Sequence, residues 1–144
     1  MRFINILIIL LLVFGIKTTN AQSVSKISDG DKSKIIKSIL SEEFPLKDAQ
    51  TACISTENIP KSMLEQFPKI SGVKFILAAP DKIGEFDCGL EYYFFDNFEK
   101  KRSSILVSFG NNYRNVSSAG RRYSYRKVKG KWRGKIVGFF LSRT

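Results

Sequence analysis

The sequence predicts an α+β fold, in which an N-terminal helix and a second short helix pack on an antiparallel sheet of about five strands. Apolar residues at helical spacing mark the helices in the first half of the chain. Runs rich in aromatic and β-branched residues, separated by turn signals, mark the strands of the second half. No repeat and no linker divides the chain, so residues 22–144 are expected to form a single domain.

Residues 1–21 are typical of a cleavable signal peptide. Their apolar run, residues 3–16, is shorter than the ~20 residues that span a membrane. Thr19 and Ala21 place small residues at the third and first positions before the expected cleavage site. The protein is therefore expected to be exported, either to the periplasm or out of the cell, with no transmembrane segment after cleavage. An uncleaved anchor is the alternative.

Cys53 and Cys88 are the two cysteines of the chain, and an exported chain leaves the reducing cytosol. A disulfide between them is therefore expected. It would close a loop of 36 residues, which the loop-entropy relation values at roughly 3–4 kcal/mol. Two unpaired, buried cysteines are the alternative.

The first helix is expected over residues 31–44. Ser28, Asp29 or Asp31 can cap its start, and Pro45 ends it because a residue before proline avoids helical angles. One helix face carries the apolar residues Ile35, Ile36, Ile39, Leu40 and Phe44.

The middle of the chain predicts a second, shorter helix between two strands. A short strand is expected around residues 52–55, and the helix starts near Pro60. The apolar run at residues 73–79 is read as a strand, and residues 81–89 as a loop. The inward face of the short helix is expected to hold Met63, Leu64 and Phe67.

Residues 90–98 and 103–109 predict a central pair of antiparallel strands. A four-residue turn at 99–102 would place Phe94 opposite Val107. Both faces of the pair are then apolar, which is typical of strands covered on both sides.

The C-terminal segment predicts a turn at residues 110–112, a polar loop at 113–120 and two last strands at 121–128 and 131–141. This order of elements suits a cone-shaped arrangement that resembles cystatin-like or NTF2-like folds. The resemblance is an analogy of fold alone, and no motif of either family supports it.

The charge of the chain is divided between its two parts. The formal net charge is +11, yet all 13 Asp and Glu residues precede Lys100. Thirteen of the 24 Lys and Arg residues lie in residues 100–144. Such asymmetry predicts either pairing between the two parts or an anionic partner.

The absence of histidine excludes most catalytic and metal-binding chemistry. It removes Ser-His-Asp and Cys-His catalysis and nearly all zinc and copper sites. No P-loop, dinucleotide fingerprint or Cys-x-x-Cys motif is present, so no cofactor, no metal and no catalytic residue are expected. An acidic segment with Asp81, Glu85, Asp87 and Glu91 is read as a solvated loop, and acid–base or Ca²⁺ chemistry is its alternative.

The dipeptide Lys129-Gly130 predicts a two-residue hairpin turn that sets the register of the last two strands. One face of the hairpin then pairs Tyr123 with Ile136, Tyr125 with Gly134, and Lys127 with Trp132. The other face carries the expected anion- or partner-binding residues Arg122, Arg126, Lys131, Arg133 and Lys135. Because successive side chains of a strand point to opposite faces, this register gives the hairpin a core side and a cationic side.

The same register places Arg126 directly opposite Arg133, and like charges opposite one another in a sheet repel. Carboxylates such as Glu91 or Asp96 can offset the repulsion, or an anionic ligand can. Arginine suits the second role because its planar fork binds carboxylate and phosphate through two hydrogen bonds.

These observations favour an exported, non-enzymatic binding module that engages an acidic protein or an anionic component of the cell envelope. One alternative is a ligand-binding or hydrolytic cone that uses Asp or Glu in a pocket between the first helix and the sheet. Another is a structural subunit of an exported assembly, with an apolar patch around Phe139, Phe140 and Leu141. A nucleic-acid partner is not favoured, because the register directs the aromatic residues away from most of the charge.

Overall fold

The computed structural model describes residues 26–44, 50–86, 88, 91–113 and 116–143. The signal peptide predicted over residues 1–21 lies outside this part of the chain. The described part forms one sheet with helices, which confirms the α+β class at that level. None of its helices is both long and apolar enough to cross a membrane.

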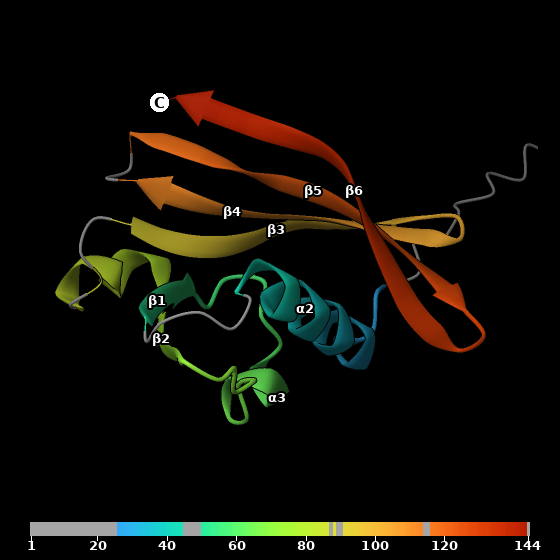
Figure 1. Ribbon diagram of the computed structural model, residues 1–144, viewed down its shortest axis with the longest axis horizontal. Helices are drawn as coiled ribbons and strands as arrows, with labels where there is room; N and C mark the ends of the chain where they lie inside the picture. The colour runs from blue at the N-terminus through green and yellow to red at the C-terminus, as the bar shows by residue number, and fades with distance from the viewer. Residues whose placement is uncertain (1–25, 45–49, 87, 89–90, 114–115, 144) are drawn as a thin grey trace, which may run out of the picture.

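The sheet has six strands in the order β2-β1-β3-β4-β5-β6, one more than predicted (Figure 1). The elements in chain order are α2 (Asp29–Glu43), β1 (Gln50–Ser55), α3 (Lys61–Leu64), β2 (Val73–Ala78), η1 (Pro80–Glu85), β3 (Glu91–Lys101), β4 (Ser104–Tyr113), β5 (Ser117–Val128) and β6 (Lys131–Arg143).

Helix α2 forms as its apolar spacing predicts and packs on one face of the sheet. Ser28 is its N-cap, and the backbone N–H of Asp31 donates to the Ser28 hydroxyl at 3.1 Å. The four central apolar residues are fully buried: Ile35, Ile36, Ile39 and Leu40. Phe44 follows the helix and contacts the rings of Phe75, Tyr93 and Phe109 edge to face. The helix therefore anchors a single core that extends across the sheet.

Strands β1 and β2 run parallel, which the predicted antiparallel sheet did not include. β1 also pairs in parallel with β3 through Ile54 and Tyr93. Parallel neighbours need a crossover connection, and the segment with α3 supplies it between β1 and β2. The segment after β2, predicted as a loop, begins with the 3-10 helix η1, whose first turn accepts Pro80.

The register predicted for β3 and β4 is wrong. Phe94 lies opposite Gly110 instead of Val107, and Phe95 lies opposite Phe109. The turn has two residues, Arg102 and Ser103, and a β-bulge lies between Asp96 and Glu99. Because the turn is centred two residues later than expected, each residue of β3 pairs further along β4.

Strands β4 and β5 extend through the segment that was expected to be a turn and a polar loop. Gly110 lies opposite Gly120, and the pairing continues as far as Tyr113 with Ser117. The ring of Phe140 covers both glycines, since a Cβ on either would lie 2.7 Å from its Cζ atom. Small residues under an aromatic ring therefore allow a strand pair where the sequence indicated a loop.

The hairpin β5–β6 has the predicted two-residue turn, with Lys129 and Gly130 both at positive φ. Six predicted pairs are present, from Val128 with Lys131 to Tyr123 with Ile136. A bulge then shifts the register, so Arg122 lies opposite Gly138 instead of Val137. The hairpin bends so that its tip lies beside the start of α2 (Figure 1).

The predicted disulfide between Cys53 and Cys88 is present, with 5.6 Å between the Cα atoms. It ties β1 to the segment that follows η1. Ile83 of η1 is buried, so this short helix covers part of the sheet.

Gly134 is predicted to be indispensable for close packing of the hairpin against the core. A Cβ at this position would lie 2.4 Å from Cζ of the fully buried Tyr125. Gly134→Ala should therefore lower the free energy of unfolding by about 1–3 kcal/mol. Gly138→Ala is the matched control, because nothing lies within 4 Å of its added Cβ. Equal urea midpoints for the two variants would contradict this packing.

Candidate cationic face

The five cations predicted from the sequence lie on one face of the β5–β6 hairpin, which we call the cationic face. It comprises Arg122, Arg126, Lys131, Arg133 and Lys135. Residues of β5 and β6 at alternate positions share a side, and the intervening Tyr123 and Tyr125 are fully buried on the other. The side chains of the cationic face therefore point away from α2.

The pairing of Arg126 with Arg133 is direct, as predicted, and both residues are exposed. Lys135 lies opposite Ser124, and Lys131 lies opposite Val128. Among the residues that the structure describes, no member of the cationic face forms an ion pair or a side-chain hydrogen bond. The repulsion between the two arginines is therefore left to solvent and salt.

The carboxylates expected to neutralise these arginines are occupied elsewhere. Glu91 accepts a hydrogen bond from the side chain of Asn111. Asp96 accepts from the backbone N–H and the side-chain amide of Asn97, at 2.7 and 2.8 Å. Among the described residues, neither carboxylate forms an ion pair with the cationic face.

The structure adds Lys101 to this surface, a residue that the sequence reading missed. Lys101 lies opposite Ser104, which lies opposite Arg126, so one row crosses four strands from Lys101 to Arg133. Its ammonium group lies 3.4 Å from Glu99, and both side chains are 57% exposed. The turn predicted over residues 99–102 included Lys101, so this row could not be predicted. In the structure the turn is Arg102 and Ser103, and Lys101 pairs with Ser104.

A hollow of about 250 Å³ adjoins the cationic face at the β3 bulge. It is lined by Asn97, Glu99, Lys101, Leu106, Val107, Ser108 and Arg122. Arg122 thus borders a concave site, while Arg126 and Arg133 lie on open strand surface. The hollow lies at the bulge, where Asn97 adopts the left-handed region with φ 53°.

The opposite side of the hairpin is held to α2 by Asp31. Trp132 Nε1–H donates to Asp31 Oδ1 at 2.8 Å, and Lys127 Nζ lies 3.8 Å from the same oxygen. The hydrogen bond from Trp132 is the main cause that lowers the pKa of Asp31 below its usual range, and the charge of Lys127 adds to it. Lys127 is thus used for attachment, which explains why it is not part of the cationic face.

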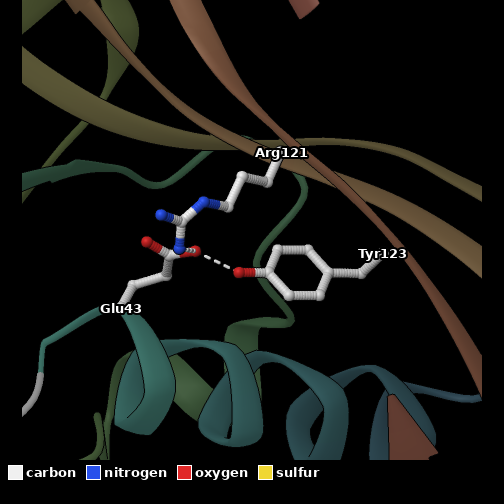
Figure 2. Close-up of polar contacts among 3 residues, drawn as sticks. All are labelled: Glu43, Arg121 and Tyr123. Carbon is white, nitrogen blue, oxygen red and sulfur yellow. Dashed lines mark hydrogen bonds and ion pairs between the residues drawn. The ribbon is translucent and has the colours of Figure 1, made fainter. Parts of the chain in front are cut away.

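A second attachment lies at the other end of α2 (Figure 2). Tyr123 donates its hydroxyl hydrogen to Glu43 Oε1, and Arg121 Nη1 lies 2.9 Å from the same oxygen. Burial, together with the Glu43 carboxylate, raises the pKa of Tyr123 well above its usual range. Two acidic residues of α2 therefore fix which side of the hairpin faces the core.

Comparisons with models of protein families, with curated proteins and with solved structures find no match. No group of three or more His, Cys, Asp or Glu that could hold a metal ion occurs among the described residues. In the predicted acidic loop, Asp81 and Glu85 are exposed on η1, and Asp87 lies outside the described residues.

The pocket expected for a hydrolytic cone is only partly present. The space between the middle of α2 and the sheet is filled by buried side chains, including Tyr125. A hollow of about 170 Å³ beside Glu43 is lined by Tyr93, Phe109, Asn111 and Arg121, among others. Arg121 and Tyr123 both engage the Glu43 carboxylate, so this carboxylate holds the hairpin to α2.

Tyr123 is predicted to make the fold sensitive to alkaline pH. Its raised pKa means that its contribution to stability is complete below about pH 10 and is lost as pH rises above that value. The difference in unfolding free energy between wild type and Tyr123→Phe should therefore be constant from pH 7 to about pH 10 and shrink above it. Urea unfolding at a series of pH values measures this difference. A difference that does not change above pH 10 would show that Tyr123 ionises equally in the folded and unfolded chains.

Proposed function

We propose that the protein is an exported, non-enzymatic binding module that engages an anionic partner through the cationic face. The observation that carries this proposal is the exposed pair Arg126 and Arg133, which lie directly opposite each other. Among the described residues, neither arginine forms an ion pair with a carboxylate. The pair costs stability in the free chain, and an anion bound between the arginines would offset that cost.

The geometry of the face favours a partner with several acidic groups. Three cations lie on β6 at alternate positions, so their spacing follows the strand at ~6.6–6.8 Å per two residues. Carboxylates or phosphates repeated at a similar interval would meet Lys131, Arg133 and Lys135 together. Either an acidic protein or an anionic component of the cell envelope offers such a repeat, and the chain's positive charge would speed association with both.

The proposal of export rests on the predicted signal peptide, and the disulfide and the absence of a spanning helix among the described residues are compatible with it.

The alternative role, as a structural subunit, is favoured by one observation. Phe139 and Leu141 of β6 are 77% and 70% exposed, which is a large apolar exposure for an edge strand. Phe140, the third residue of the predicted patch, instead packs over Gly110 and Gly120 on the other face.

The double variant Arg126→Glu with Arg133→Glu should abolish retention of the mature protein on immobilised polyglutamate at low salt. Both side chains are exposed and without partners among the described residues, so the fold should survive. Retention of the wild type should fall steeply as the salt concentration is raised, because the Debye length shrinks from about 10 Å at 0.1 M to 3 Å at 1 M.

The matched control is Lys61→Glu with Lys69→Glu, which changes the net charge equally at two exposed residues away from the hairpin. This control should keep most of the retention. Equal loss in both double variants would show that net charge alone drives binding, and unchanged retention of the Arg126/Arg133 variant would overturn the proposal. Vesicles with and without an anionic lipid, tested with the same variants, separate an envelope surface from an acidic protein.

A further inference from the structure

The outer edge of β6 is the longest free strand edge that the structure describes. The sheet order places β6 at one border, with 13 residues, and β2 at the other, with 6. Among the described residues no strand pairs with the outer side of β6. Such an edge presents unpaired backbone N–H and C=O groups that can receive another strand.

The two faces of β6 differ in chemistry. On the side of the cationic face the strand carries Lys131, Arg133 and Lys135. On the α2 side it carries Ile136, Phe139 and Leu141, which are 38%, 77% and 70% exposed. The cations lie in the first half of β6, and these apolar residues lie in the second half. An added strand would meet both sets with acidic side chains on one face and apolar side chains on the other.

Charge decides between a second copy of the chain and a different partner. Antiparallel pairing of two β6 strands would place the basic strands of two copies side by side, each with Lys131, Arg133 and Lys135. No Asp or Glu follows Lys100 in either copy, so nothing in the paired strands would offset the repulsion. An acidic segment has the opposite effect, because its carboxylates neutralise the same cations.

We infer that β6 receives an extended acidic segment of a partner protein as a seventh strand. The carboxylates of this segment lie over Arg133 and Lys135, and its apolar side chains contact Phe139 and Leu141. Backbone hydrogen bonds to β6 then supply affinity that does not depend on salt, and the alternation supplies specificity. This inference rests on the proposed function and names the partner and its conformation.

The test uses synthetic peptides of alternating glutamate and valine, with fluorescence anisotropy as the readout. The matched control, the block peptide, has the same composition arranged as glutamate pairs alternating with valine pairs, so it cannot place a glutamate at every cation of β6. The alternating peptide should bind at least about tenfold more tightly, since only it can place both kinds of side chain correctly along a strand. Backbone N-methylation at all glutamates, or at all valines, blocks one edge of the peptide strand. At least one of these methylated peptides should lose about tenfold in affinity.

Variants of β6 locate the binding edge. Phe139→Ser with Leu141→Ser should weaken the alternating peptide and leave the block peptide unaffected. Val128→Ser, also at an exposed apolar residue of the hairpin, is the control and should change neither.

The outcomes separate this inference from the proposed function. If the block peptide and both methylated peptides bind as tightly as the alternating one, strand addition is wrong and anion binding stands. If no acidic peptide binds even at low salt, both fail. If the wild type forms dimers in sedimentation that Phe139→Ser abolishes, the edge receives a second copy, and the inference of an acidic partner strand is overturned.

Discussion

The arrangement of this protein depends on the burial of Tyr123 and Tyr125 against helix α2. Both side chains are fully buried, and two residues of the helix hold the strands that carry them. Asp31 binds the hairpin tip through Trp132 and Lys127, and Glu43 binds its other end through Tyr123 and Arg121. Because side chains alternate along a strand, fixing the tyrosines on one side forces the intervening cations to the other.

This constraint explains how the chain can have a strongly basic C-terminal part without burying that charge. The cations on the α2 side, Arg121 and Lys127, are paired with the acids of the helix. Those on the opposite side are exposed, and among the described residues they have no acidic partner. The acidic first part of the chain thus compensates one side of the hairpin and leaves the other charged. A surface of uncompensated like charge lowers the stability of the free protein, and a bound anion would raise it.

Local signals predicted the parts of the structure that local chemistry controls. The Lys129-Gly130 turn gave the hairpin register, and the apolar spacing of Ile35 to Leu40 gave the buried face of α2. The parts that depend on distant contacts were not predictable in this way. The two-residue turn has Arg102 at positive φ, a residue type that gives no turn signal. The β3 bulge at Asn97 lies inside the strand predicted over residues 90–98. The extension of β4 and β5 past Gly110 depends on Phe140, a residue far along the chain. Lys101 and the hollow beside Arg122 were therefore missed.

The most direct test of this account is the equilibrium stability of Arg133→Glu at low salt, measured with and without polyglutamate. The substitution replaces a like-charged cross-strand pair with an opposite one, so the free variant should be more stable than the wild type by about 0.2–1 kcal/mol. Polyglutamate should then stabilise the wild type and have little effect on the variant, because only a ligand bound to the folded state raises its stability. The account would be contradicted if the free variant is no more stable than the wild type and polyglutamate stabilises both equally.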